Sequence, residues 1–339
     1  MGFKETLGQL LERQDLTHEA MLGVMHQVMG GELTQAQIAA FLIALRAKGE
    51  TVDEIAAAAM VMRELSIKVD IQDKAHLIDT CGTGGDGIQT FNVSTVSAFV
   101  AAAAGAKVAK HGGRSVSSTC GSADVLEALG VNVNQTPQQV AASVNEIGIG
   151  FMFAPNHHSA MKHAAPVRRE LGVRTLFNLL GPMTNPANAH RQVMGVFDQS
   201  LTTKLAKVLQ QLGSEHVLVV HGADGMDEIS FTGDTFVAEL KNGEVTEYLI
   251  NPAQWGLGLH DVKDIQIQNA EESKAMILAV LNGKPGAARD IVLLNAGAAI
   301  YVSGLVDTMQ AGIEKAAAVI DSGAALQKLH QLISYSNQA

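Results

Sequence analysis

Five short segments combine residue types whose spacing could do chemistry. The first, Asp79 to Gly87, places a glycine-rich loop between a short apolar run and a segment that resembles a helix. Glycine lets the backbone approach an anion closely, and the free N–H groups of such a loop can hold phosphate. The loop is not a Walker sequence, because no Gly-Lys-Ser/Thr follows, and it fits a dinucleotide fingerprint poorly. Taken alone, it is equally well interpreted as a tight strand-to-helix turn without a ligand.

The second and third segments add side chains that suit phosphate. Asn92-Val93-Ser94-Thr95 begins a helix, where its polar groups could cap the helix or bind phosphate oxygens or a phosphate-bound Mg²⁺. The segment from Lys110 to Ser118 supplies two fixed cations, a histidine and three hydroxyl groups. The chain has a formal net charge of −10, so a polyanionic substrate needs local neutralisation of this kind. We therefore favour a phosphate site over a solvated loop.

The fourth segment is the adjacent carboxylate pair Asp227-Glu228, which follows an apolar strand at residues 216–220. Mg²⁺ prefers a few protein oxygens together with water and substrate phosphate. An isolated Asp-Glu pair is usually solvated surface. Its position after a strand predicts a metal site here.

The fifth segment, residues 156–178, is rich in histidine and arginine. His157, His158 and His163 suggest zinc, but adjacent histidines do not face one metal from a regular element, and no His-Glu-x-x-His is present. We therefore favour a different role for this segment. An arginine such as Arg168 can hold a carboxylate through two parallel hydrogen bonds.

The elements that must position these segments change in type near residue 70. The first seventy residues read as helices, with Thr17 and Thr34 as caps and with Thr51 and Glu54 in a capping box. After them, short apolar strands alternate with helices, as in a largely parallel sheet covered on both faces. The expected strands are 77–79, 107–110, 149–153, 191–197 and 216–220, and the expected helices are 92–104, 122–129, 138–147 and 201–212.

One hairpin interrupts this alternation, because residues 236–240 and 245–249 flank an Asn-Gly turn. The chain is mostly helical from residue 271 onward. The predicted fold class is α/β, with an N-terminal α-helical domain at residues 1–70, joined by a returning segment around residues 165–190. Residues 71–164 and 191–339 form the larger α/β domain with a mostly parallel central sheet. A ligand is expected in the cleft between the two domains.

The composition excludes several classes of function. An acidic chain has no general attraction for nucleic acid or for anionic membranes, so neither is expected as a partner. Cys81 and Cys120 form no Cys-x-x-Cys pair, which argues against structural zinc and a disulfide framework. The start of the chain lacks the pattern of a signal peptide, and no apolar stretch is long enough to span a bilayer. We expect a cytoplasmic protein.

Taken in order, these motifs resemble the anthranilate phosphoribosyltransferase family of tryptophan biosynthesis. The resemblance rests on residues 82–86, 92–95, 110–118 with 121–130, 168–186 and 227–228, and it covers nearly the whole chain. It implies a fold of the nucleoside phosphorylase class II type. It also implies transfer of the phosphoribosyl group of phosphoribosyl pyrophosphate to the amino nitrogen of anthranilate, which releases pyrophosphate. The further implications are two Mg²⁺ ions per monomer and a homodimer that associates through the helical domain.

The resemblance assigns roles residue by residue. Three residues are implied to take part in catalysis, namely Lys110, His111 and Arg168. Anthranilate is implied to contact Gly82, Gly113 and Arg168, with Arg168 facing its carboxylate, while Ser94 binds one Mg²⁺ and Asp227 with Glu228 the other. The residues implied to bind phosphoribosyl pyrophosphate are Gly82, Gly85, Asp86, Thr90, Asn92, Val93, Ser94, Thr95, Lys110, His111, Gly112, Gly113, Arg114, Ser115, Val116, Ser117, Ser118 and Ser122.

The chain departs from the family pattern in one loop. Many members have Asn after Lys-His-Gly, and that Asn contacts anthranilate, whereas this chain has Gly113. Thr119-Cys120 also replaces the more usual Lys-Ser. These differences concern the binding of anthranilate rather than of phosphate.

Two alternatives stay open at this point. One is a pyrimidine nucleoside phosphorylase-like enzyme of the same fold, although the loop from Lys110 to Ser118 fits it poorly. The other is a non-catalytic relative that binds nucleic acid, which would need a basic groove. The net charge of −10 and the Asp227-Glu228 pair argue against that second alternative.

Overall fold

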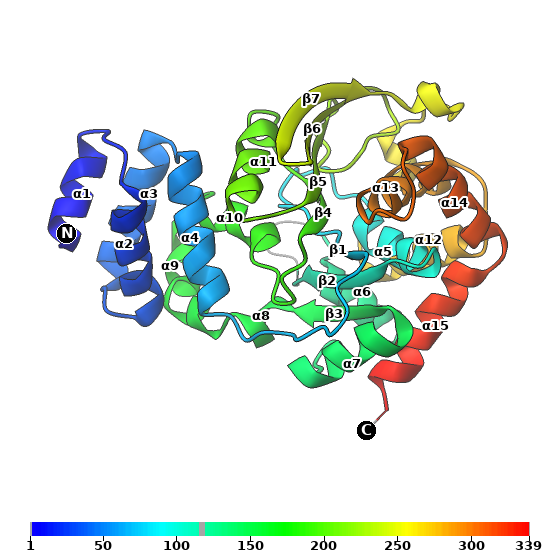
Figure 1. Ribbon diagram of the computed structural model, residues 1–339, viewed down its shortest axis with the longest axis horizontal. Coiled ribbons are helices and arrows are strands. Elements are labelled where there is room, and N and C mark those ends of the chain that lie inside the picture. Colours follow the sequence, from blue (N-terminus) through cyan, green and yellow to red (C-terminus); the bar gives the residue numbers. More distant parts are fainter. Residues whose placement is uncertain (1, 115–118, 339) are drawn as a thin grey trace.

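The computed structural model describes residues 2–114 and 119–338, and its N-terminal part is a helical bundle set apart from the sheet (Figure 1). Each of the capping threonines Thr17, Thr34 and Thr51 accepts a hydrogen bond from the third N–H of its helix, which confirms the predicted helix starts. The bundle helices are α1 (Phe3–Leu11), α2 (His18–Gly30), α3 (Gln35–Lys48) and α4 (Val52–Glu64).

A later segment of the chain returns to this bundle. It carries short helices that the sequence did not predict: α8 (Ala154–His157), η1 (Ser159–His163), α9 (Ala165–Leu171), α10 (Phe177–Leu180) and η2 (Gly181–Met183). Helix α9 packs on α3 and α10 packs on α4. Val167 and Phe177 are buried in the same apolar cluster as the bundle side chains. The bundle core therefore contains chain from both sides of the first three strands.

The larger part is built on a seven-stranded sheet with the order β3-β2-β1-β4-β5-β6-β7. Its first five strands run parallel, and β6 and β7 are antiparallel additions at one edge. The strands are β1 (Leu77–Asp79), β2 (Lys107–Gly112), β3 (Ile149–Phe153), β4 (Arg191–Gly195), β5 (His216–Gly222), β6 (Thr235–Lys241) and β7 (Glu244–Ile250). The predicted fold class, a helical bundle plus an α/β part with a mostly parallel sheet, is confirmed.

The β6–β7 hairpin turns at the predicted Asn-Gly pair. Asn242 has φ of 53° and Gly243 has φ of 79°, and both values lie in the left-handed region that a tight hairpin turn requires. Asn and Gly adopt that region most readily. The hairpin prediction is therefore confirmed, with each strand longer than expected.

Helices cover both faces of the sheet (Figure 1). On one face, α11 packs on β5 and β6 and also on α4 of the bundle. On the other, α5 and α13 pack together at the centre and α15 packs against α5 and α7. No helix in residues 2–114 and 119–338 is long and apolar enough to cross a bilayer. The helices of the α/β part are α5 (Val93–Ala103), α6 (Ser122–Ala128), α7 (Pro137–Ile147), α11 (Leu201–Gln211), α12 (Ala270–Leu281), α13 (Ala287–Val302), α14 (Met309–Asp321) and α15 (Ala324–Ser336).

The topology determines where the chemistry-bearing loops meet. Strands β2, β1, β4 and β5 are consecutive parallel neighbours, so their carboxyl ends share one edge of the sheet. The glycine loop follows β1, Lys110 lies near the end of β2, and the Asp227-Glu228 pair follows β5. Ligands of open α/β sheets bind outside that edge.

Candidate functional site

The glycine loop is held against the ends of β4 and β5. The N–H of Thr83 donates to the carbonyl oxygen of Gly195 over 2.8 Å, and the N–H of Gly84 donates to Asp227 Oδ2 over 2.8 Å. A Cβ atom at Gly195 would lie 1.5 Å from the carbonyl oxygen of Asp227, so only glycine permits this approach. The packing of β4 against the Asp227 backbone therefore sets the position of that carboxylate.

Part of the loop presents unpaired donors. The N–H groups of Gly85, Asp86 and Gly87 donate to no acceptor within residues 2–114 and 119–338. Gly84, Gly85 and Gly87 have φ values of 63°, 82° and 79°, which turn successive peptides in a way that larger residues adopt rarely. A run of free N–H groups in such a loop is a concave site for an anion. The phosphate interpretation of the loop is therefore favoured over the plain turn.

Three carboxylates gather beside this loop. The N–H of Asp227 donates to Asp86 Oδ2 over 3.4 Å, which brings the two carboxyl groups together. Burial and the charge of Asp86 raise the pKa of Asp227, and burial and the charge of Asp227 raise the pKa of Glu228. The charged forms are disfavoured because these carboxylates lie in one another's field. A bound cation would relieve that repulsion.

Lys110 lies at the centre of the cluster and is only 4% exposed. Its Nζ donates to the carbonyl oxygen of Thr80 over 2.7 Å and to Ser94 Oγ over 3.3 Å. The Lys110 charge lowers the pKa of Glu228 against the effect of burial. Strand β2 thus delivers one fixed cation between the glycine loop and the start of α5.

Helix α5 begins at this cluster, but its first residues differ in what they offer. Asn92 does not cap the helix: its amide donates to the carbonyl oxygen of Cys120 over 3.1 Å and its Oδ1 accepts from Ser273 Oγ over 2.7 Å. The simple capping interpretation is therefore wrong for Asn92. Val93 is buried in the core, so only its backbone can face a ligand. The hydroxyl of Thr95 is buried and has no hydrogen-bond partner among the described residues.

Gly112 and Ser122 are in close contact. A Cβ at Gly112 would lie 2.1 Å from Ser122 Oγ, whereas a Cβ at Gly113 would meet no atom of the described residues within 4 Å. Ser122 Oγ donates to the carbonyl oxygen of Gly113 over 3.4 Å. Thr90, between the glycine loop and α5, forms a β-bridge with Gln266. The turn after β2 is thus tight at its first glycine and open at its second.

Arg114 is directed towards α6 in this structure. Its guanidinium pairs with Asp124 over 3.0 Å and with Glu127 over 2.6 Å. Its charge is therefore paired with two carboxylates in salt bridges, whereas Lys110 forms no salt bridge among the described residues. The expected phosphate-binding residues Ser115, Val116, Ser117 and Ser118 lie outside the described residues.

Arg168 has the surroundings of a carboxylate receptor. It lies in α9, is half-buried, and places its guanidinium over the ring of Phe177 at 5.4 Å. Its side chain has no ion pair and no hydrogen bond within the part of the chain that the structure describes. Burial lowers its pKa, because the cation is partly removed from water. A half-buried cation of this kind suits an incoming carboxylate.

His111 and His158 are buried, and burial disfavours their charged forms. His111 Nδ1 lies 3.2 Å from the carbonyl oxygen of Gly181, and its Nε2 is buried without a described partner. The ring of His158 lies 5.1 Å from that of His111. Burial lowers the pKa of His111 to about 3 and that of His158 to about 4. His157 instead lies against Ile67 O over 3.0 Å, so the adjacent histidines face different partners.

Asp79 is a central residue whose role the sequence motifs did not reveal. Its Oδ1 accepts from the N–H groups of Thr80 and His111 over 2.7 and 3.1 Å, and its Oδ2 accepts from Asn185 Nδ2 over 2.7 Å. Burial raises its pKa to about 6. An aspartate at the end of a buried strand could have signalled this role. Asn185, 106 residues later, carried no such signal.

Asp79, Cys81 and His111 also place one potential ligand atom each within 4.8 Å of one another. Burial raises the pKa of the Cys81 thiol to about 12, and the Asp79 carboxylate already accepts three hydrogen bonds. A thiol and an imidazole are poor ligands for Mg²⁺. The oxygen-rich group of Asp86, Asp227 and Glu228 suits that ion better.

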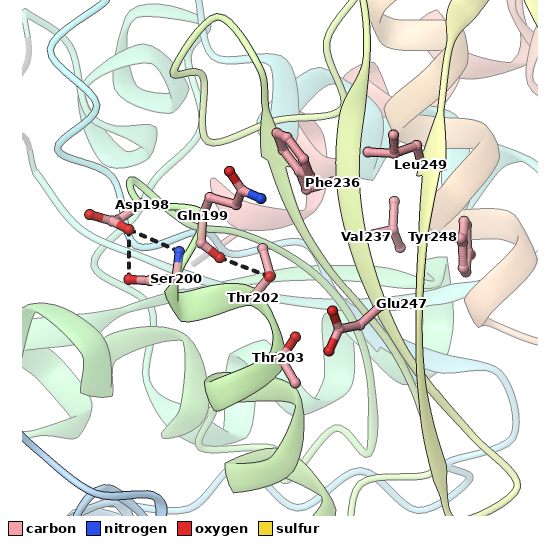
Figure 2. A pocket seen from close by; sticks show the side chains of 10 residues that line it. All are labelled: Asp198, Gln199, Ser200, Thr202, Thr203, Phe236, Val237, Glu247, Tyr248 and Leu249. Carbon is pink, nitrogen blue, oxygen red and sulfur yellow. Dashed lines mark hydrogen bonds between the residues drawn. The ribbon is translucent and has the colours of Figure 1, made fainter.

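A separate hollow of about 670 Å³ lies between the start of α11 and the hairpin (Figure 2). In Figure 2, Asp198 caps its own turn through Ser200, while Phe236 and Leu249 project from β6 and β7. None of the residues expected to bind substrate lines this hollow. The carboxylates, the lysine and the free N–H groups therefore identify the site better than the size of a hollow does.

Comparison with known proteins agrees with this geometry. Residues 74–326 match the glycosyl transferase family, a/b domain, and residues 4–66 match the glycosyl transferase family, helical bundle domain. The chain is 66% identical over 336 residues to an anthranilate phosphoribosyltransferase of Methylobacillus flagellatus, with 99% of this chain and 98% of the relative covered.

Solved structures give the same result. The anthranilate phosphoribosyltransferase of Thermus thermophilus is 40% identical, with a TM-score of 0.93 over 98% of this chain and 99% of that one. The Saccharomyces cerevisiae protein, solved with phosphoribosyl pyrophosphate and Mg, is 29% identical, with a TM-score of 0.82 over 94% of this chain and 92% of that one.

Proposed function

The chain belongs to the anthranilate phosphoribosyltransferase family, and on that premise we propose how its residues divide the work of the reaction. The reaction transfers the phosphoribosyl group of phosphoribosyl pyrophosphate to the amino nitrogen of anthranilate, in tryptophan biosynthesis. It yields N-(5-phosphoribosyl)anthranilate and pyrophosphate. The nucleoside phosphorylase and nucleic-acid-binding alternatives are not favoured, because the similarity spans the whole chain.

One observation carries the assignment of the phosphate site. Lys110 Nζ lies 3.3 Å from Ser94 Oγ, while Asp227 Oδ2 accepts the N–H of Gly84. Segments from four parts of the sequence thus meet around one group of free N–H donors. The free N–H groups of Gly85 and Asp86 with the Lys110 ammonium would hold the phosphates, and the hydroxyl groups of Ser94 and Thr95 lie on the adjoining helix start.

The residues present fit a divalent cation. Burial and the neighbouring negative charges, that of Asp86 included, raise the pKa values of Asp227 and Glu228, and a cation would reverse the effect of those charges. We assign Ser94 to one Mg²⁺ and Asp227 with Glu228 to a second, in keeping with the Mg found in the yeast relative. When bound, Mg²⁺ would neutralise the charge that develops on the leaving pyrophosphate.

Anthranilate would bind between the bundle and the sheet. The guanidinium of Arg168, which has no carboxylate partner among the described residues, would hold the carboxylate of anthranilate. The open position of Gly113 would leave space for the ring, Gly82 would contact it through its backbone, and the neutral His111 would line the same region. Arg168 thereby orients the amine towards C1 of the ribose.

The remaining chemistry needs little from the protein. An aromatic amine is neutral at pH 7, so it can attack the ribose carbon without a strong base. As the bond to pyrophosphate breaks, the carbon gains oxocarbenium character, and Lys110 and the loop N–H groups stabilise the departing charge. The arylammonium group formed by the attack is acidic and loses its proton to water, so we assign no general base. Lys110 acts on the leaving group, and Arg168 acts on the acceptor.

Three broader assignments accompany this function. We propose that residues 1–70 with the returning segment around residues 165–190 act as one domain, and that residues 71–164 and 191–339 act as the other.

We also propose a homodimer formed through the helical domain, which the exposed apolar side chains Leu11, Ile43 and Met60 support. Light scattering tests the dimer, and a monomeric chain at micromolar concentration would contradict it. We place the protein in the cytoplasm with its cysteines reduced, as both are free.

The direct test is the loss of anthranilate fluorescence on mixing with phosphoribosyl pyrophosphate, with and without Mg²⁺. Mg²⁺-dependent loss is expected. If fluorescence persists while phosphoribosyl pyrophosphate still binds, the acceptor is a different amine. Phosphorolysis of a pyrimidine nucleoside in a coupled assay would revive the phosphorylase alternative, and a salt-dependent gel shift would revive the nucleic-acid alternative.

A further inference from the structure

Arg174 contacts three separate parts of the chain from the loop between α9 and α10. Its Nη2 donates to the carbonyl oxygen of Gly85 in the glycine loop. Its guanidinium stacks on Phe197, with 3.9 Å between Cζ and the ring centroid. Its own carbonyl oxygen accepts a hydrogen bond from Nη1 of Arg46 in α3. One residue therefore connects the helical bundle, the glycine loop and the segment that follows β4.

The contact with Gly85 fixes the direction of a donor. The carbonyl of Gly85 and the N–H of Asp86 belong to one planar trans peptide, so they point in opposite directions. When Arg174 holds the carbonyl, the N–H of Asp86 is turned to the opposite side of the loop. That N–H has no acceptor in the described part of the chain. Gly84 and Gly85 on one side of this peptide give it conformational freedom, which Arg174 restricts.

The stacking contact holds the guanidinium itself. Phe197 is tied to the same loop, because its N–H donates to Thr83 Oγ1 over 3.2 Å. Arg174 is exposed, so its charge is screened and contributes little by itself. Its planar shape allows it to stack and to donate in the same plane, which an ammonium cannot do. Its effect is therefore geometric rather than electrostatic.

We propose that Arg174 is a positioning residue for the diphosphate of phosphoribosyl pyrophosphate, and that Arg46 links this position to the helical bundle. Arg174 orients the Asp86 peptide towards the anion, and the Arg46 hydrogen bond carries any displacement of α3 to the same loop. The inference rests on the proposed function, since it assigns the diphosphate to the glycine loop. Two nearby arginines then have different roles, because Arg168 receives anthranilate while Arg174 prepares the site for the other substrate.

The test is calorimetric titration of phosphoribosyl pyrophosphate in the presence of Mg²⁺, together with steady-state kinetics. Arg174→Ala is expected to raise the Kd for phosphoribosyl pyrophosphate about tenfold, because the freed Asp86 peptide must then be ordered when the ligand binds. Its KM for anthranilate should stay within about twofold of the wild-type value. Arg174→Lys, which can donate but not stack, should recover part of the affinity. Arg169→Ala is the matched control, because Arg169 is exposed and has no ion pair within residues 2–114 and 119–338.

Arg46→Ala tests the link to the bundle. It should weaken the binding of phosphoribosyl pyrophosphate, and its effect should not add to that of Arg174→Ala, because both act on one connection. Wild-type affinity in Arg174→Ala would overturn the inference, and additive effects would overturn the link through Arg46. If Arg174→Ala does not fold, the affinity for phosphoribosyl pyrophosphate is measured in Arg174→Lys and Arg46→Ala instead. Wild-type affinity in both variants would then overturn the inference. A wild-type protein that does not bind phosphoribosyl pyrophosphate would instead overturn the proposed function.

Discussion

The N–H of Asp227 donates to Asp86 Oδ2 over 3.4 Å, so two carboxylates that are 141 residues apart in sequence meet at the edge of the sheet. Glu228 adds a third, and Lys110 alone does not neutralise them, since the pKa values of both Asp227 and Glu228 are raised. The free N–H groups of the glycine loop lie beside them. The N–H groups suit a phosphate and the carboxylates suit a metal ion, so the site should bind the two together more tightly than either one alone.

The double substitution Asp227→Asn, Glu228→Gln should remove the magnesium site. The double variant should lose Mg²⁺-dependent turnover by about a hundredfold or more, because the metal-assisted neutralisation of the leaving group is lost. Its thermal midpoint without Mg²⁺ should equal or exceed that of the wild type, because the repulsion between carboxylates is removed. Activity assays and thermal denaturation with and without Mg²⁺ measure both effects.

The control for that experiment is Asp224→Asn, which changes a nearby carboxylate that serves its own turn through Ser230 and Thr232. This control should keep the Mg²⁺ dependence of turnover. Normal activity in the Asp227→Asn, Glu228→Gln protein would refute the metal assignment.

Arg168→Ala should act mainly on anthranilate. Loss of a charge-assisted contact with a carboxylate corresponds to roughly 1.5–3 kcal/mol, so the KM for anthranilate should rise about tenfold to a hundredfold. The KM for phosphoribosyl pyrophosphate should change little. Steady-state kinetics with each substrate varied in turn measures the difference, and an unchanged KM for anthranilate would rule out this role for Arg168.

The elements were predicted well where a local signal was strong. The threonine caps at Thr17, Thr34 and Thr51 and the Asn242-Gly243 turn depend on hydrogen bonds and dihedral angles within a few residues. The five parallel strands were found because buried strands are apolar throughout. The short helices α8, α9 and α10 were missed, because four to seven residues give too little periodicity for a prediction.

The site was predictable only in part. Glycines, a lysine and adjacent carboxylates carry recognisable chemistry, so the loops themselves could be found. The partners of Arg174 could not, since its contacts with Gly85 and Arg46 span 89 and 128 residues. The pairing of Arg114 with Asp124 and Glu127 was also not foreseen, because a basic loop residue can face a ligand or a neighbouring helix with equal ease.

The buried histidines His111 and His158 contribute to the pH dependence of the free energy of unfolding. Burial lowers the pKa of His111 from 6.5 to about 3 and that of His158 from 6.5 to about 4, and the neighbouring His158 adds to the effect at His111. Below a pH of about 6.5 these two imidazole rings bind protons in the unfolded chain but stay unprotonated in the folded chain. The two histidines should therefore lower the free energy of unfolding as the pH decreases from about 6.5 towards 4, while the raised pKa values of Asp79, Asp227 and Glu228 act in the opposite direction.

Urea denaturation at a series of pH values measures this trend. Relative to the wild type, His158→Gln should be more stable at low pH than at neutral pH, because one group that resists protonation is removed. His18→Gln, which changes an exposed histidine in the first turn of α2, should leave the slope unchanged. An equal slope in wild type and His158→Gln would show that the buried rings do not govern acid stability.

Gly113→Asn should improve the binding of anthranilate. A Cβ at this position would meet no atom within 4 Å among residues 2–114 and 119–338, and the φ of Gly113 lies outside the left-handed region, so the backbone accepts a larger residue. An amide there could add one hydrogen bond to the substrate, worth roughly 0.5–1.5 kcal/mol, which lowers the KM for anthranilate about twofold to tenfold. Gly112→Ala provides the contrast, because its Cβ would lie 2.1 Å from Ser122 Oγ and 3.0 Å from Phe151 Cε2. That variant should weaken the binding of phosphoribosyl pyrophosphate by displacing Ser122. Steady-state kinetics with each substrate varied in turn measures both effects. A KM for anthranilate that rises in Gly113→Asn would mean that the open space at this position is already used by the substrate.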